Sequence, residues 1–312
     1  MITIKKVEIK GYFGRGDFEW NLDPVVNILG GKNGSGKSSI FKLCYLLLSN
    51  ERIEDNIDKN FSNIFEKVII TLSNGWTQTW TRAEKDESYS VDISFTKPLV
   101  YRDATRILDE KGMVRSFSEL KELTKVFLIN SFEQHTAQAT RYEQQPKSEP
   151  LDDPTMLDLM IKDQIDIRNK DFSKVMEDFV DSSDDEDTKR TEYIKIHKKI
   201  YYTLSNFLKE YEEPIKSSFI FTKGNQQIGY EHLSMGEKQI LLLMLMVGNT
   251  KQEPCIFFMD EPDLSMHIDW KEILVKELHD LNPNMQIILS THAPSVITGW
   301  HDRVKEVSQL IK

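Results

Sequence analysis

The residues from Gly31 to Ser38 have the types and the spacing that are needed to hold the phosphates of a nucleotide. They read Gly-Lys-Asn-Gly-Ser-Gly-Lys-Ser and fit the pattern G-x-x-x-x-G-K-[ST]. Glycines let backbone amides come close to phosphate oxygens, and a helix that begins there adds free N–H groups and a positive dipole end. We expect Lys37 to reach the β- and γ-phosphates and the Ser38 hydroxyl to bind Mg²⁺. The residues expected to contact the nucleotide are Asn33, Gly34, Ser35, Gly36, Lys37, Ser38 and Ser39.

The flanking sequence supplies the elements that would place this loop. An apolar run at 25–29 precedes it and is typical of a buried parallel strand. Residues 38–48 follow it with apolar side chains at helical spacing. Because strand, glycine-rich turn and helix are the context in which such a loop binds phosphate, we interpret Gly31–Ser38 as a phosphate-binding loop.

A second group of candidate residues ends a hydrophobic strand. The run Cys-Ile-Phe-Phe-Met at 255–259 is followed by two carboxylates, Asp260 and Glu261. Adjacent residues of an extended chain point to opposite sides, which suits two distinct roles. Beside a bound nucleotide, the first carboxylate would hold Mg²⁺ and the second would polarise the attacking water. We therefore expect Asp260 to be a metal ligand and Glu261 to be the general base.

Residues 233–239 predict a second anion-binding position. They read Leu-Ser-Met-Gly-Glu-Lys-Gln and open a mostly apolar helix that extends to Val247. Ser234 is a good N-cap, and Ser234 and Gly236 stand where a helix presents free amides at its positive end. One ATP molecule has only one set of phosphates. We therefore expect this helix start to close on the nucleotide of another subunit.

Two further polar side chains follow predicted strands. The strand at 285–290 leads into Thr-His-Ala-Pro-Ser, which places His292 just past its end. Because ligands of open α/β sheets bind outside the carboxyl ends of the strands, we expect His292 to contact the γ-phosphate. Gln134 follows the strand at 126–130 and is a candidate ligand of Mg²⁺, and Gln138 is an alternative for the same role.

Composition places the chain among globular proteins. It has 312 residues, of which 39% are hydrophobic and 29% charged, and a net charge of −10. This acidic balance argues against a chain that wraps nucleic acid with its whole surface, although a local basic patch would still bind it. Cys44 and Cys255 lie in apolar runs and are expected to be buried side chains. The first residues do not resemble a signal peptide and no apolar run approaches the ~20 residues that span a bilayer, so we expect a cytoplasmic protein without membrane contact.

Several segments predict antiparallel strands beside the nucleotide core. Residues 2–10 alternate between apolar and polar side chains and are expected to form a hairpin with 17–22. Asn74-Gly75, between two β-rich runs, is a strong hairpin signal, and residues 89–95 predict another strand. Residues 219–228 predict a further hairpin.

Residues 153–213 predict a helical arm. Two helices, at about 155–180 and 190–212, carry apolar residues in steps of three and four. The acidic run at 181–187 separates them and is interpreted as a solvated turn. Because no linker is long enough to separate independent domains, we expect residues 1–312 to form a single unit that contains this antiparallel arm.

Four motifs in this order resemble those of the ATP-binding-cassette (ABC) ATPases, in particular the branch of RecF, the SMC proteins and the OLD-type ATPases. They are the phosphate loop, the signature at 233–237, the acidic strand at 255–261 and the switch residue His292. The run Asp-Glu-Pro-Asp-Leu-Ser that begins at Asp260 is similar to the acidic-strand and D-loop region of OLD-type members. The resemblance covers residues 1–48 and 228–296.

The resemblance implies both a fold and an activity. The implied fold is an α/β P-loop NTPase, namely an ABC-type ATPase head with an antiparallel β-subdomain and a short helical arm. The implied activity is binding and hydrolysis of ATP with Mg²⁺. The implied assembly is a homodimer or higher homo-oligomer in which Lys37 and Ser38 of one head face the Ser234 region of the other.

Three differences from the sequences of these families change the function that we expect. The arm is far too short for an SMC coiled coil, no C-x-x-C is present for a zinc hook, and the chain ends soon after His292, where OLD-type proteins continue into a nuclease. We therefore expect a defence ATPase without a fused nuclease that controls a separate effector, a nuclease or a toxin, in anti-phage defence. The alternative is a DNA-repair or DNA-maintenance ATPase that binds DNA directly, which a salt-dependent DNA affinity would favour.

Overall fold

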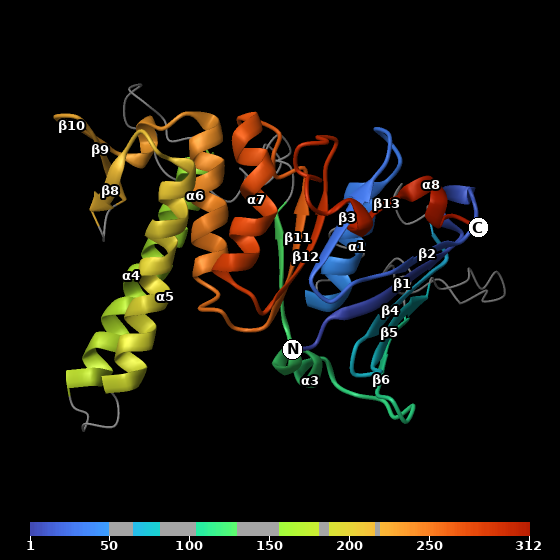
Figure 1. Cartoon of the computed structure of the whole chain (residues 1–312). Coiled ribbons are helices and arrows are strands. Elements are labelled where there is room, and N and C mark those ends of the chain that lie inside the picture. Colours follow the sequence, from blue (N-terminus) through green and yellow to red (C-terminus); the bar gives the residue numbers. More distant parts are fainter. Residues whose placement is uncertain (50–64, 82–103, 130–155, 181–186, 216–218) are drawn as a thin grey trace, which may run out of the picture.

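The computed structural model is layered, and it describes residues 1–49, 65–81, 104–129, 156–180, 187–215 and 219–312. A parallel sheet lies in the centre (Figure 1). Helices α4 to α7 cover one face of this sheet, and helix α1 (Lys37–Ser49) and an antiparallel sheet cover the other. This arrangement confirms the predicted mixed α/β architecture with an antiparallel subdomain.

The central sheet brings the ends of the motif-bearing strands to one level. Its order is β13-β3-β12-β11-β7, and every neighbouring pair is parallel. The bounds are β3 (Val26–Gly30), β7 (Lys125–Ile129), β11 (Cys255–Asp260), β12 (Met285–Ser290) and β13 (Val304–Glu306). Asp260 pairs in register with Ser290, and Ser290 with Leu29. The phosphate loop, the acidic pair and His292 therefore all follow the carboxyl ends of adjacent strands, where α/β sheets bind ligands.

The strand β11 contributes to two hydrophobic cores. Cys255, Phe257 and Met259 belong to the cluster on the side of the helical layer. Ile256 and Phe258 belong to the cluster around α1 and the antiparallel sheet. Because successive side chains of a strand point to opposite faces, an unbroken apolar run is what a strand covered on both faces requires.

The helical layer is built around α6 (Met235–Gly248), whose side chains from Ile240 to Leu245 are fully buried. Helices α4 (Met156–Val180), α5 (Asp187–Phe207) and α7 (Ile268–Leu281) pack on it or on one another. The two arm helices run along this layer and then project beyond it (Figure 1). The guanidinium of Arg168 on α4 lies over the Tyr201 ring of α5, 5.3 Å from the ring centroid. Helix α5 ends five residues before the predicted limit, because the chain turns there into strand β8.

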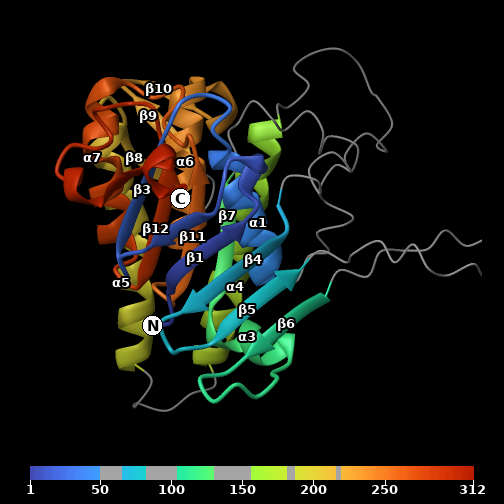
Figure 2. The same ribbon diagram turned by 90° about the vertical axis from the view of Figure 1, so that its right-hand side faces the viewer.

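The antiparallel sheet has the order β2-β1-β4-β5-β6, and Figure 2 looks onto its strands. The bounds are β1 (Ile4–Lys10), β2 (Phe18–Asn21), β4 (Lys67–Leu72), β5 (Thr77–Thr81) and β6 (Ala104–Leu108). The predicted N-terminal hairpin is β1–β2, and the Asn74-Gly75 turn joins β4 to β5 with Gly75 at φ 86°. Both hairpin predictions are confirmed.

The remaining elements are short. A third sheet contains β8 (Glu212–Ile215), β9 (Ile220–Lys223) and β10 (Gln226–Ile228), which confirms the hairpin predicted at 219–228. Helix α3 (Phe117–Leu123) is capped by Ser116, and α8 (Val307–Leu310) is near the C-terminal end. The strand predicted at 89–95 lies outside the described residues, and β6, β8, α7, β13 and α8 were not predicted.

The burial of the cysteines and the character of the helices bear on two expectations from the composition. Cys44 and Cys255 are buried free thiols, as predicted, and burial raises the pKa of each to about 12. Among the helices of the described residues, none has the length and apolar character that crossing a membrane requires.

Candidate nucleotide-binding site

The phosphate loop turns sharply between β3 and α1. Gly34 and Gly36 have φ values of 72° and 96°, in the left-handed region that glycine adopts most easily. A Cβ atom on Gly36 would collide with the Tyr12 hydroxyl and would lie 2.8 Å from an atom of the Phe13 ring. Glycine is therefore required at this position both for its backbone angle and for its size.

Tyr12 supports the phosphate loop from the N-terminal hairpin. It lies in the short 3-10 helix η1 (Tyr12–Gly14) that follows β1, and its hydroxyl donates a hydrogen bond to the Ser35 carbonyl oxygen at 2.7 Å. Burial raises the pKa of Tyr12 well above its usual value, so the phenol stays a donor at neutral pH. No local pattern in the sequence predicts this contact, because it joins residues 23 positions apart.

Lys37, the first residue of α1, is buried with 5% of its surface exposed. Its ammonium group donates a hydrogen bond to the Gly31 carbonyl oxygen at 2.8 Å and lies 2.9 Å from Nε2 of His292. The positive charge is thus held inside the turn of the phosphate loop. This is the place where a lysine neutralises the outer phosphates of a nucleotide.

His292 lies between the lysine and the acidic strand end. Its Nε2 is 3.2 Å from Oε1 of Glu261 and 2.9 Å from Nζ of Lys37. This nitrogen accepts a hydrogen bond from Lys37 when it carries no proton, and it donates one to Glu261 when it does. The structure therefore brings together three side chains from three separate segments, and their catalytic roles remain predictions.

Ser290, at the end of β12, organises both carboxylates. Its hydroxyl donates to Oδ1 of Asp260 at 2.5 Å and accepts from the Glu261 N–H at 3.1 Å. Asp260 is only 2% exposed, whereas Glu261 is partly exposed, so the two carboxylates face different surroundings. No local pattern in the sequence marks Ser290 as a site residue. Its position opposite Asp260 in the neighbouring strand would identify it, but this register is not known until the strands are paired.

The backbone at Glu261 is in an uncommon conformation. Its φ value is 49°, in the left-handed region that few residues other than glycine adopt. The Glu261 N–H also donates to the Ser290 carbonyl oxygen at 3.1 Å, so the neighbouring strand holds this conformation. Such residues are typical of functional sites, where the surrounding structure determines an unfavourable angle.

The turn after Glu261 is anchored by the buried side chain of Asp263. Its Oδ1 accepts a hydrogen bond from the Thr291 hydroxyl at 2.9 Å, and its Oδ2 lies 3.2 Å from Nζ of Lys271 on α7. Thr291 directly precedes His292 in the sequence. The acidic pair and His292 are therefore held by one connected network.

The residues of the loop fit a nucleotide with Mg²⁺. The Ser35 hydroxyl is buried and has no hydrogen-bond partner in the described part of the chain, which leaves it for a phosphate oxygen. Asn33, Gly34 and Ser38 are exposed at the outer side of the loop, and Ser39 is partly exposed. Ser38 and Asp260 supply the oxygen ligands that Mg²⁺ prefers. Gln134 and the alternative Gln138 lie outside the described residues.

Ser234 and Gly236 begin α6 in a different layer. The Ser234 N–H donates to Oε2 of Glu237 at 2.7 Å, and the Ser234 hydroxyl accepts from the Glu237 N–H at 3.4 Å. Ser234 is exposed, whereas Gly236 is buried and a Cβ atom on it would lie 2.5 Å from the Ser265 carbonyl oxygen. Because α6 and α1 lie on opposite faces of the central sheet, the signature and Lys37 belong to different layers of one chain.

A protein family matches half of the chain. Residues 143–298 match the family described as "AAA domain, putative AbiEii toxin, Type IV TA system". The matched segment contains α6, the acidic pair and His292, but not the phosphate loop. The family match and the phosphate-loop motif are therefore independent observations.

Two curated relatives come from bacteria. "Retron Vc95 probable ATPase" of Vibrio cholerae serotype O1 biovar El Tor is 24% identical, over 91% of this chain and 69% of its own length. "Retron Ec83 probable ATPase" of Escherichia coli is 26% identical, over 60% of this chain and 36% of its own length. The match thus spans only about a third of the second relative.

The fold is similar to solved SMC heads. An Smc head domain with an extended coiled coil, bound to the C-terminal domain of ScpA from Pyrococcus furiosus, aligns with a TM-score of 0.56 at 14% identity, over 95% of this chain and 91% of that chain. An SmcHead bound to the C-winged helix domain of ScpA aligns with a TM-score of 0.51 at 14% identity, over 94% and 90%. The likeness concerns the fold alone, and it confirms the predicted ABC-type ATPase head.

Proposed function

We propose a cycle of ATP binding and hydrolysis for this chain. The proposal starts from the fact that the chain belongs to the family described as AAA domain, putative AbiEii toxin, Type IV TA system. The observation that carries the proposal is the convergence of Lys37, Glu261 and His292 within hydrogen-bond distance. Lys37 provides a cation, Glu261 provides a carboxylate that can act as a base, and His292 provides a polar group whose partner can change. These are the groups that transfer of the γ-phosphoryl group of ATP to water requires.

Each of these side chains takes one role in hydrolysis. Lys37 neutralises charge on the β- and γ-phosphates, and Glu261 accepts the proton of the attacking water. ATP replaces the contacts that His292 makes with Lys37 and Glu261, so His292 turns to the γ-phosphate and Glu261 is released to hold water. Ser38 and Asp260 would hold Mg²⁺, which would supply positive charge against the negative charge that develops on the phosphates.

The ATP molecule is shared between two heads, with the Ser234 region of one copy facing Lys37 of the other. The surface around Ser234 supports this, because Met235, Leu264 and Ile268 are 51%, 44% and 58% exposed. Gly236, which follows Met235, lies close to Ser265 and Trp270, which are near Leu264 and Ile268 in the sequence. Exposed apolar side chains that gather in one place are typical of an interface.

Substitution of Ser234 by Arg is expected to abolish ATP-dependent association of the heads. The bulky side chain would fill the space of the opposing phosphate, whereas the fold remains because Ser234 is exposed. Light scattering in the Glu261→Gln background, in which ATP persists, measures the association. Ser118→Arg, an exposed position on α3, is the matched control. Equal association of the two variants would mean that the nucleotide is not shared between heads.

We further propose that the output is control of a separate effector, a nuclease or a toxin, in anti-phage defence. Support comes from the retron ATPases among the relatives and from the way the arm joins the signature helix. Lys238 on α6 forms an ion pair with Asp158 on α4 at 2.7 Å, and both side chains are buried. Lys251 forms a second pair with Asp171 at 2.8 Å. A displacement of α6 therefore acts directly on α4.

Shortening the arm is expected to abolish effector capture while nucleotide binding stays intact. Residues 175–192 can be replaced by a short Gly-Ser bridge, because the buried ones among the described side chains of α4 and α5 lie outside this range. They are Leu157, Asp158, Ile161, Ile165, Arg168, Ile200, Tyr201, Thr203, Leu204 and Phe207. Co-purification of the effector encoded beside this protein, together with an ATP-binding assay, measures both properties. Capture of the same effector by the shortened protein would contradict the role of the arm.

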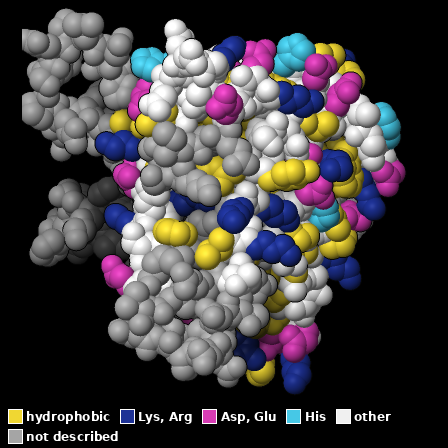
Figure 3. Space-filling view, turned by 60° about the vertical axis from the view of Figure 1, so that its left-hand side comes forward, with side chains coloured by type: hydrophobic (Ala, Val, Ile, Leu, Met, Phe, Trp, Pro, Cys, Tyr) yellow, Lys and Arg dark blue, Asp and Glu magenta, His cyan; other side chains and the backbone are white. Residues whose placement is uncertain are grey.

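Direct DNA binding is the weaker candidate for the output. On the face that carries the arm, several Lys and Arg side chains gather near the centre of the view beside hydrophobic ones, and acidic side chains lie around them (Figure 3). This mixed surface, together with a net charge of −10, favours a protein partner over a nucleic acid backbone. We place the protein in the cytoplasm, where reduced thiols such as Cys44 and Cys255 are stable.

A further inference from the structure

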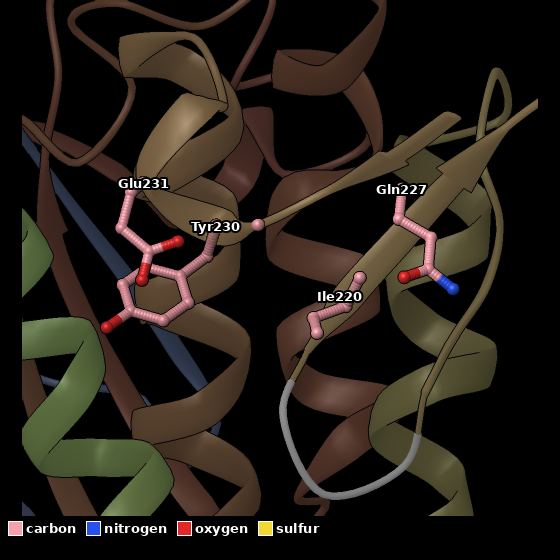
Figure 4. A pocket seen from close by; sticks show the side chains of 5 residues that line it. Ile220, Gln227, Tyr230 and Glu231 are labelled. Atoms are coloured by element: carbon pink, nitrogen blue, oxygen red, sulfur yellow. The ribbon is translucent and has the colours of Figure 1, made fainter.

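A cavity of about 470 Å³ is lined by residues that precede the signature helix α6 in the sequence. It opens between the β9–β10 hairpin and the short 3-10 helix η5 (Tyr230–His232) (Figure 4). The side chains that line it belong to Ile220, Gln227, Tyr230 and Glu231. The backbone of Gly229 lies between the first two and the last two of these residues. Its volume is within the range of about 300–1,000 Å³ of small-ligand sites. The ATP cycle described above uses none of these residues.

The lining combines a carboxylate, an aromatic ring and an amide. Tyr230 and Glu231 stand on one side of the opening, and Gln227 and Ile220 stand on the other (Figure 4). A Cβ atom on Gly229 would collide with the Glu231 carboxylate, so glycine at this position makes room for that group. Among the described residues Glu231 forms no salt bridge with a cation; its exposed carboxylate accepts a hydrogen bond from the Tyr230 hydroxyl.

Burial and nearby negative charges both act on the hydroxyl of Tyr230. Burial raises the pKa of Tyr230 to about 12, and the charges of Glu231, Asp158 and Asp166 act in the same direction. Lys238 offsets this charge only in part, because it pairs with Asp158. The Glu231 carboxylate has oxygen lone pairs beyond the one that Tyr230 uses, and together with the ring face and the Gln227 amide oxygen it suits one chemical group best. A guanidinium group forms charge-assisted hydrogen bonds with a carboxylate and stacks on an aromatic ring.

We propose that this cavity binds a basic side chain, above all an arginine, of a separate protein partner. Phosphates of nucleic acid are repelled by the same carboxylates. A chain with a net charge of −10 attracts a basic protein. Because Glu231 precedes Ser234 by three residues, the bound side chain adjoins the start of the signature helix.

Binding is tested on the full chain without nucleotide, so the result does not depend on the ATP cycle. The protein carries ¹³C-labelled isoleucine δ1 methyl groups, and the Ile220 signal is assigned by its loss in Ile220→Val. The probe is N-acetyl-arginine N-methylamide. We expect a saturable shift of the Ile220 signal and none of Ile4, which is buried in the antiparallel sheet. The citrulline counterpart, which keeps the shape and lacks the charge, is expected to bind at least about tenfold more weakly.

Variants identify the group that recognises the charge. Glu231→Gln is expected to weaken binding of the arginine probe about tenfold, whereas Glu122→Gln, an exposed position on α3, leaves it unchanged. Equal binding of the arginine and citrulline probes, or an Ile220 signal that does not shift, would overturn the proposal. ATP-dependent self-association that is lost in Glu231→Gln would show that a second copy supplies the cation, so the assignment to a separate partner would be wrong.

Discussion

Glu261→Gln is expected to lower ATP turnover about 10²- to 10⁴-fold while ATP binding persists. The amide keeps the shape of the side chain but does not accept the proton of the attacking water. Binding persists because the substitution leaves the phosphate loop unchanged. It also leaves the hydrogen bond between Ser290 and Asp260, so the other carboxylate stays in place. Phosphate release and equilibrium binding of ATP, measured on the same preparation, test both parts.

The matched control for this variant is Glu272→Gln, which changes an exposed glutamate on α7. Its turnover is expected to equal that of the unmodified protein. A Glu261→Gln protein that hydrolyses ATP at the unmodified rate would remove Glu261 from the role of general base. Loss of ATP binding in the same variant would instead point to a role of this carboxylate in holding the nucleotide.

Lys37→Met is expected to weaken ATP binding about 100-fold, and turnover falls with it. The variant keeps the alkyl stem, so little buried volume is lost, but it removes the ammonium group that faces the phosphates. Hydrogen bonds between charged partners contribute about 1.5–3 kcal/mol each, and about 2.7 kcal/mol corresponds to a factor of 100. The shift of the melting temperature by ATP measures this loss, because a ligand stabilises only the protein that binds it.

Two observations separate this effect from simple unfolding. Without ATP, the melting temperature of Lys37→Met reports the loss of the hydrogen bond from Lys37 to the Gly31 carbonyl oxygen, which is a small effect. Lys42→Met, a partly exposed position on the same helix, is the control and is expected to bind ATP normally. Unchanged ATP affinity in Lys37→Met would contradict the assignment of the phosphate loop.

Local patterns in the sequence were sufficient for the elements that bear the motifs. The glycines at 31–36 predicted a turn between a strand and a helix, and the structure has that turn with φ values in the left-handed region. Asn74-Gly75 predicted a hairpin for the same reason, since backbone preference acts over a few residues. The apolar run at 255–259 predicted a buried strand, because only a strand covered on both faces is apolar at every position.

Contacts between distant segments were decided by the tertiary structure. The hydroxyl of Ser290 reaches Asp260 across 30 residues, and that of Tyr12 reaches Ser35 across 23. No local pattern marks either side chain, because strand register and helix packing depend on burial summed over a whole sheet. The same holds for the placement of α1 and α6 on opposite faces of the central sheet. The sequence by itself predicted two anion-binding helix starts, because capping and glycine patterns are local, and only the tertiary structure decided that the two helices belong to different layers.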